Sequence, residues 1–392
     1  MPPAEKKRAE KKLEPFKELF NRPLVLDLAA HIKRRWKDFD EKAFIAAALK
    51  DFKTLEMKAR ANQIATALGA YLPRDVPRAL KLLTSTLRPL DKSGEPVKDP
   101  AKGLAGMVIW PMGDYVARHG VAHVNAALAT LRELTIRSTA EFAIRPFLAR
   151  DPKKTLAVMK GWAKDKNRHV RRLASEGSRP RLPWGLRLKT FVTDPKPILP
   201  ILETLKDDPS DYVRRSVANS LNDIAKDHPE VVASIAAKWM KGASKERKRL
   251  VRHACRSLIK SGHKGTLAAL GFSAKPDVAL KAFTLDTPTV KFGAHAAFTV
   301  ELSSTGKAAQ NIVLDYVVHH QKKNGETTPK VFKWKTLTLK PGDTVRLDRR
   351  HALRAITTRS YYPGRHRVDV KVNGLTLGGA DFDLLIKPPK NP

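Results

Sequence analysis

Acidic residues follow arginines at helical spacing in an otherwise basic chain. Glu141 lies four residues after Arg137, and Glu176 lies four residues after Arg172. In a third segment, Arg215 is followed by Asn219 after four residues and by Asp223 after eight; the three segments are 35 and 43 residues apart. On a helix, Arg and Glu four residues apart commonly form a surface ion pair worth about 0.2–0.5 kcal/mol. The alternative interpretation is functional. A chain of net charge +36 that binds a polyanion should keep carboxylates away from phosphates, unless the ligand also offers a cation.

The carboxylates Glu141, Glu176 and Asp223 suit one reaction in particular. A nucleobase alkylated at N3 is a cation and leaves as a neutral molecule when its N-glycosyl bond breaks, so no general acid is required. The remaining barrier is the positive charge that develops on the sugar, as in glycoside hydrolysis. Carboxylates near C1′ stabilise that charge and orient or deprotonate water. We therefore predict that these three acids are catalytic and need no metal.

The segment SEGSRPRLPWGLR, residues 175–187, is the second candidate for chemistry. Its glycine and prolines are expected to end a helix and stiffen the chain that follows. We predict that Arg179, Arg181 and Arg187 contact phosphates. Trp184 has two interpretations. Its indole could stack on a sugar or base, or it could be buried at a junction between repeats.

Composition narrows the classes of partner and compartment. The 392 residues include 75 Lys and Arg against 39 Asp and Glu. This excess favours nucleic acid over an anionic membrane surface, because neutralised phosphates release counterions.

The single Cys255 allows neither an internal disulfide nor a cysteine zinc site. The charged start MPPAEKKRAEKKLEPF lacks the apolar core of a secretory signal, and there is no run of 18 apolar residues. We expect a cytoplasmic protein without a membrane span.

Residues 1–272 have the apolar spacing of helices, and the later ones repeat. Three segments (TLAVMKGWAK, ILPILETLK and VVASIAAKWM, at 155–164, 198–206 and 231–240) each lead through a polar turn into a second helical segment. The second segments align as VRRLA, VRRSVA and VRHAC at 170–174, 213–218 and 251–255, with an earlier copy, TIRSTAE, at 135–141. Two-helix units of this period are typical of HEAT repeats. We predict an all-α HEAT-like solenoid over residues 1–272.

Residues 273–392 alternate apolar and polar side chains, which predicts strands. The seven candidate strands are PDVALKAFTLD, AAFTVELSS, NIVLDYVVHHQ, KVFKWKTLTLK, DTVRLDRRHA, HRVDVKVNG and ADFDLLI. Asn-Gly and Pro-Gly pairs mark turns between many of them. Seven short strands in this length are typical of an immunoglobulin-like sandwich.

Further basic residues are candidates for DNA contacts. On the helices they are Arg214, Arg215, Arg247, Lys248, Arg249 and Arg252, for which a solvated charged face is the alternative. In the β part we predict that two loops enter the minor groove, through His319, His320, Lys322, Lys323, Arg354, Arg359 and Tyr361. Ordinary hairpin loops are the alternative there.

Three segments carry a family resemblance: STAEFAIRPFL (138–148), HVRRLASEGSRPRLPWG (169–185) and DYVRRSVANSLNDIAKDHP (211–229). They resemble the AlkC branch of the bacterial DNA alkylation-repair glycosylases. The segments HHQKKNG, KVFKWK and ITTRSYYPGRHRVDVKVNG are similar to the Ig-like domain of one AlkC subgroup.

The resemblance implies removal of N3-methylated bases, chiefly 3-methyladenine and 3-methylcytosine, in base excision repair. It implies no cofactor and no full flipping of the base into a pocket. The family's catalytic acids and aromatic residue correspond to Glu141, Glu176, Asp223 and Trp184. We expect double-stranded DNA with alkylated bases as the partner of a monomeric enzyme. Two other functions remain open: a non-catalytic HEAT protein that binds DNA structures, and a scaffold for an acidic protein.

Overall fold

The computed structural model describes residues 15–386 and divides into two compact units, residues 1–223 and 224–392. The N-terminal stretch in which we expected no secretory signal lies almost entirely outside the described residues. Secondary structure changes from helix to strand between Ala269 and Val278, while the domain boundary at residue 272 stays a prediction. The contacts, however, group the last helices with the strands.

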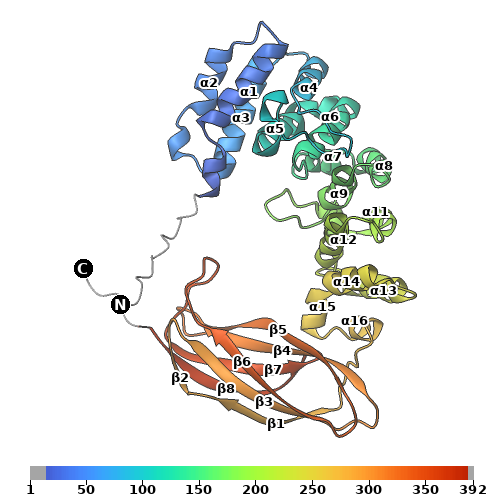
Figure 1. The fold of residues 1–392 in the computed structure, drawn as a ribbon, viewed down its shortest axis with the longest axis vertical. Helices are drawn as coiled ribbons and strands as arrows, with labels where there is room; N and C mark the ends of the chain where they lie inside the picture. Colours follow the sequence, from blue (N-terminus) through green and yellow to red (C-terminus); the bar gives the residue numbers. More distant parts are fainter. Residues whose placement is uncertain (1–14, 387–392) are drawn as a thin grey trace, which may run out of the picture. The chain divides into compact units, whose positions relative to one another are not determined.

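The described part of the first unit, residues 15–223, is helical. The helices are α1 (Arg22–Arg35), α2 (Glu41–Leu49), α3 (Met57–Tyr71), α4 (Val76–Ser85), α5 (Ile109–His119), α6 (Val124–Arg137), α7 (Arg145–Arg150), α8 (Pro152–Trp162), α9 (Arg168–Gly177), α10 (Lys189–Thr193), α11 (Leu199–Leu205) and α12 (Asp211–Ile224). Contacts join helices that are near in sequence, such as α2 with α3, α5 with α6 and α8 with α9 (Figure 1). The predicted helical body is confirmed, whereas its description as HEAT repeats stays a prediction.

Helix α9 illustrates how local sequence sets the helix ends. Asn167 caps it, since its side chain accepts a hydrogen bond from the amide of His169 at 2.8 Å. At the other end, a Cβ on Gly177 would stand 2.6 Å from the side chain of Ile144. A larger residue would therefore collide with Ile144, which lies in the turn before α7. The glycine allows α9 to pack closely where the segment that carries Trp184 begins.

Residues 224–392 contain helices α13 (Pro229–Met240), α14 (Lys245–Ala254), α15 (Arg256–Ser261) and α16 (Lys264–Ala269). The strands are β1 (Val278–Leu285), β2 (Thr289–Lys291), β3 (His295–Ser304), β4 (Gln310–Gln321), β5 (Thr327–Leu339), β6 (Thr344–Ala352), β7 (Gly364–Val372) and β8 (Leu375–Leu385). They form sheets of order β1-β3-β6 and β2-β8-β7-β4-β5, all antiparallel except β2 with β8 (Figure 1).

The β part is a two-sheet sandwich whose core comes from alternating residues. On β4, Ile312, Leu314, Tyr316 and Val318 are buried in the core shared by both sheets. The prediction of an all-β C-terminal part is confirmed. The described residues form eight strands rather than seven, because the three-residue β2 is too short to show a period of two.

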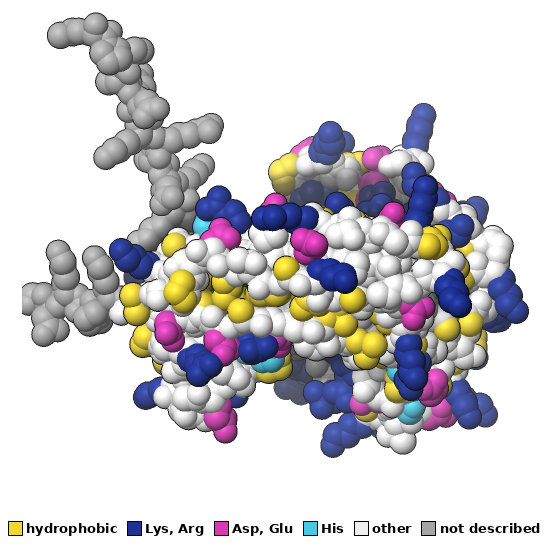
Figure 2. All heavy atoms as spheres, turned by 90° about the horizontal axis from the view of Figure 1, so that it is seen from below, with side chains coloured by type: hydrophobic (Ala, Val, Ile, Leu, Met, Phe, Trp, Pro, Cys, Tyr) yellow, Lys and Arg dark blue, Asp and Glu magenta, His cyan; other side chains and the backbone are white. Residues whose placement is uncertain are grey.

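Basic side chains are spread widely over the surface. On the face drawn in Figure 2, Lys and Arg side chains stand out at many separate points, with fewer Asp and Glu among them. Within residues 15–386, no helix combines the length and apolar character needed to cross a membrane.

Candidate functional site

Three carboxylates from separate elements meet around two arginines. Arg172 Nη1 lies 2.5 Å from Glu141 Oε2, and its Nη2 lies 3.5 Å from Glu176 Oε1. Arg179 Nη1 lies 2.6 Å from the same Glu176 oxygen, and its Nε lies 2.8 Å from Asp223 Oδ2. We call Glu141, Glu176 and Asp223 the carboxylate cluster. The two arginines link its members into one network.

Burial separates this network from ordinary surface ion pairs. Glu176 is 5% exposed and Asp223 is 3% exposed. Removing charged groups from water costs several kcal/mol per ion unless they are paired. The surface-pair interpretation is therefore wrong for these two acids.

Arg179 corrects a prediction. We expected it to contact phosphates, but it is 7% exposed and bonded to Glu176 and Asp223. The sequence could not reveal the bond to Asp223, which lies 44 residues away along the chain, although Glu176 is only three residues away. Arg179 is a partner of the carboxylate cluster rather than a surface cation.

Glu141 also has a different setting from the predicted one. It stands in the turn after α6, not on the helix, so Arg137 does not pair with it. Arg137 instead bonds Glu133, four residues before it, at 2.9 Å. The hydroxyl of Thr139 donates to Glu141 Oε2 at 2.6 Å and accepts a bond from Arg172 at 2.9 Å. A hydroxyl and a guanidinium thus orient this carboxylate.

Tyr212 covers one side of Arg172. The guanidinium carbon lies 4.8 Å from the centre of the Tyr212 ring, and the tyrosine is 41% exposed. Burial lowers the pKa of Arg172, but Glu141 and Glu176 outweigh it and raise that pKa above its ordinary value. Arg172 is therefore a permanent cation between an exposed aromatic ring and two acids.

Trp184 is exposed and held in an uncommon backbone conformation. It is 66% exposed, and its φ is +65°, in the left-handed region. Lys58 on α3 donates to the Trp184 carbonyl at 3.0 Å, with its ammonium 6.0 Å from the centre of the indole. The interpretation as a buried packing residue is wrong. The indole is available to a ligand.

A cavity of about 170 Å³ lies beside Glu141. Its lining includes Trp110, Asp114, Thr139 and Phe142, from α5 and the turn after α6. The rings of Trp110 and Phe142 are 5.2 Å apart, and burial raises the pKa of the Asp114 carboxyl. The first 130 residues therefore supply side chains next to the cluster, which the sequence did not indicate.

The remaining predicted phosphate contacts of the first unit differ in exposure. Arg187 and Arg215 are exposed, and Arg181 is half-buried. Arg214 donates to the carbonyls of Asp208 and Pro209 at 2.5 and 3.0 Å, so it closes the turn before α12. Arg187 and Arg215 keep the exposure that a phosphate contact requires.

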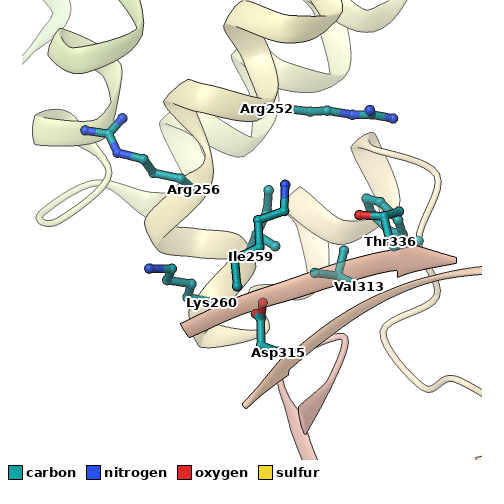
Figure 3. Close-up of a pocket in the computed structure, with 9 residues that line it drawn as sticks. Arg252, Arg256, Ile259, Lys260, Val313, Asp315 and Thr336 are labelled. Carbon is teal, nitrogen blue, oxygen red and sulfur yellow. The ribbon is translucent and has the colours of Figure 1, made fainter. Parts of the chain in front are cut away.

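In the second unit, Lys248, Arg249 and Arg252 are exposed on α14, and Arg247 is half-buried. Arg252 also lines a cavity of about 110 Å³ between α14–α15 and the sheet, shown in Figure 3. Asp315 of β4 points into this cavity from the strand. Arg252 therefore lines the same cavity as Lys333 and Asp315 of the sheet.

The minor-groove prediction is wrong for His319 and His320, because both lie within β4. His320 is 5% exposed, and its ring lies 5.9 Å from that of His351. Burial, with a contribution from Arg359, lowers the pKa of His320 to about 3. It is neutral at physiological pH and cannot offer a charge to DNA. His319 bonds Asp369 at 2.8 Å.

The other predicted groove residues lie nearer the surface. Lys322, Lys323 and Arg354 are exposed in the turns that follow β4 and β6. Arg359 bonds the His320 ring, and Tyr361 is half-buried. Among residues 15–386, no group of three His, Cys, Asp or Glu side chains is placed to hold a metal ion.

Sequence reasoning missed several residues at the site. Thr139 and Tyr212 could have been suspected, because each lies within a segment already singled out. Arg145 also lies within such a segment, STAEFAIRPFL, whereas Lys58 gave no such signal. Lys58 reaches Trp184 across 126 residues of chain, and Arg145 is fully buried beneath the segment that carries Trp184.

Comparisons with known proteins identify the family. Residues 130–258 match the family model described as a DNA alkylation repair enzyme, and residues 279–386 match the C-terminal Ig-like domain of the uncharacterised protein YhaZ. YhaZ of Bacillus subtilis is 35% identical over 370 residues, which cover 94% of this chain and 99% of YhaZ.

A solved structure is also similar over nearly the whole chain. It is the Pseudomonas fluorescens alkylpurine DNA glycosylase AlkC bound to DNA containing an abasic site analog. It is 39% identical, with a TM-score of 0.85, and the match covers 95% of this chain and 100% of that one. The chain therefore belongs to the AlkC-type DNA alkylation repair family, in the subgroup with a C-terminal Ig-like domain.

Proposed function

We propose that this protein is a DNA glycosylase that excises cationic, N3-alkylated bases such as 3-methyladenine and 3-methylcytosine. The observation that carries the proposal is the buried carboxylate cluster in a chain of net charge +36 that also exposes Trp184 in the segment following Glu176. A basic protein that buries acids and exposes an indole in the segment after one of them fits a ligand that is a polyanion overall but a cation at one base. The similarity to an alkylpurine DNA glycosylase supports the same class of enzyme.

The chemistry requires the carboxylate cluster to act on the sugar. The N-glycosyl bond breaks, its electron pair goes to the base, and the base leaves neutral. Positive charge builds at C1′ and is stabilised by Glu141, Glu176 and Asp223. Water then attacks C1′ and gives its proton to a carboxylate, from which the proton passes to solvent. An ionised carboxylate has about four lone-pair sites, so a bond to arginine still leaves others for water or the sugar.

The exposed aromatic side chains are placed for binding rather than for bond breaking. Trp184 and Tyr212 offer ring faces to a sugar, a base or a cation. Arg187 and Arg215 are exposed cations that would bind phosphates on either side of the lesion. In this proposal the helical part, with its HEAT-like repeats, holds the lesion. The Ig-like domain adds affinity through exposed loop residues such as Lys322.

A specific observation favours the competing function, a non-catalytic protein that binds DNA structures. Each member of the carboxylate cluster already has an arginine partner, as a purely structural network would. The exposed, strained Trp184 argues against that view, because a structural network has no use for an indole in solvent.

The test is release of free base from methylated DNA, measured by chromatography, with Glu176→Gln as the key variant. Glu56→Gln is the matched control, since that carboxylate is 80% exposed and pairs only with Lys17 in the described structure. We expect the wild type and the control to release 3-methyladenine. Glu176→Gln should lose release but still bind abasic-site DNA. Base release that survives Glu176→Gln would remove this residue from the mechanism, and none from the wild type would favour the non-catalytic function.

A further inference from the structure

Arg145, at the start of α7, is fully buried. Its Nε donates to the carbonyl of Leu186 at 2.5 Å, and its Nη1 donates to that of Gly177 at 2.8 Å. Among the described residues, none accepts a hydrogen bond from its Nη2. A buried cation costs several kcal/mol unless its surroundings compensate it. Packing alone would be served better by an apolar side chain.

The two carbonyls mark the ends of one segment, residues 177–186, which carries Trp184. A single guanidinium therefore ties the two ends of this segment together. Gly185 lies against it, where a Cβ would stand 3.2 Å from Cδ and Nε of Arg145. Any other residue at 185 would press on the guanidinium. The close approach of this backbone to Arg145 explains the glycine that follows Trp184.

The conformation of Trp184 requires such a tether. A non-glycine residue in the left-handed region costs about 1–2 kcal/mol, and Trp184 has φ of +65°. Its side chain is too exposed for packing to offset that strain. Lys58 holds the Trp184 carbonyl from one side, and Arg145 fixes the ends of the segment from beneath.

Arg145 also acts on the carboxylate cluster through its charge. All three acids of the cluster attract it electrostatically, although among the described residues it forms no direct ion pair with any of them. Burial, followed by repulsion from Arg179, lowers the pKa of Arg145 to about 10, so it stays a cation at neutral pH. Its charge therefore helps to compensate the buried acids without occupying their oxygens.

We propose that Arg145 is a positioning residue, which fixes the segment 177–186 and so holds the exposed indole of Trp184 in the place where it meets the DNA. In this role Arg145 does not act on DNA or on the attacking water directly. It acts through Trp184, and this role rests on the proposed glycosylase function.

The first measurement is independent of activity. Hydrogen exchange of the amides in 178–188 is compared between the wild type, Arg145→Lys and Arg60→Lys. Lysine keeps the charge but cannot hold both carbonyls. Arg60 is the matched control, because it is 4% exposed and its guanidinium also donates to backbone carbonyls, those of Leu55, Lys17 and Phe20. We expect faster exchange of this segment only in Arg145→Lys. Unchanged exchange there would overturn the tether.

The second measurement is a double-mutant cycle that combines Arg145→Lys with Trp184→Ala. The quantity measured is the single-turnover rate of base release. Each single variant should lower the rate by about 10-fold or more, and the double variant should stay within about 3-fold of the slower single. Rate losses that multiply would show that Arg145 does not act through Trp184. If the wild type releases no base, the proposed function fails, and the same cycle is measured in the Kd for abasic-site DNA. Coupled losses in Kd would support the positioning role, and independent losses would refute it.

Discussion

Arg179 provides the sharpest test of the site, because two descriptions of it predict opposite results. As a phosphate contact, its replacement would weaken DNA binding and leave folding intact. As the buried partner of Glu176 and Asp223, its replacement by methionine leaves two acids, whose side chains are 6% and 4% exposed, with one partner fewer. Breaking a buried ion pair by removing one member costs about 3–5 kcal/mol.

That magnitude is large enough to measure directly. For a unit of this size, 1 kcal/mol shifts the Tm by about 2–4 °C, so Arg179→Met should lower the Tm by about 6–20 °C. The salt dependence of DNA binding, measured below that Tm, should be unchanged. Arg187→Met is the control, since Arg187 is exposed in the same segment. It should keep the Tm and reduce the slope of log K against log salt by about 0.9.

The reverse result would refute the reasoning. If Arg179→Met keeps the Tm of the wild type and reduces the salt slope, the side chain contacts phosphate rather than Glu176 and Asp223. The carboxylate cluster would then lack one of the two arginines that join it, and the case for a buried site would fail with it.

Two predictions concern residues 224–392. Gly374 has φ of +84°, and a Cβ there would stand 2.1 Å from the Cα of Gly262. Gly325 is the control, because it has a similar φ of +81° but no described atom within 4 Å of such a Cβ. Gly374→Ala should therefore lower the unfolding free energy by about 1–3 kcal/mol more than Gly325→Ala. Equal losses in thermal melts would contradict the contact. His320 and His351 have pKa values lowered by burial to about 3 and about 4. Unfolding lets them take up protons below pH 6.5. The stability that they contribute as neutral groups is therefore complete above that pH, and it is lost as the pH falls towards their pKa values in the folded protein. Each histidine should lower the unfolding free energy by about 2 kcal/mol between pH 7.5 and pH 5; replacing both with Gln should flatten the dependence, and an unchanged slope would count against the buried pair.

Several features of the fold follow from local sequence and were predicted. Helices before residue 270 and most strands after 277 have apolar periods that a few residues define. The Asn373-Gly374 turn likewise needs only two residues, which both adopt positive φ. The strand β2 was missed because Thr289–Lys291 is shorter than any pattern, and it exists only through its pairing with β8.

The sequence by itself determined which side chains are present, their helical or strand periods, and a charge suited to a polyanion. Tertiary structure decided which of the possible partners they meet. Glu141 pairs with Arg172, 31 residues away, and not with Arg137, four residues away, since the chain leaves the helix between Arg137 and Glu141. Burial decided that Arg179 faces acids and that His320 is neutral. Ion pairing depends on distances between segments that are far apart in the chain, and a pKa depends also on how far each group is buried. Both quantities are set only once the chain has packed.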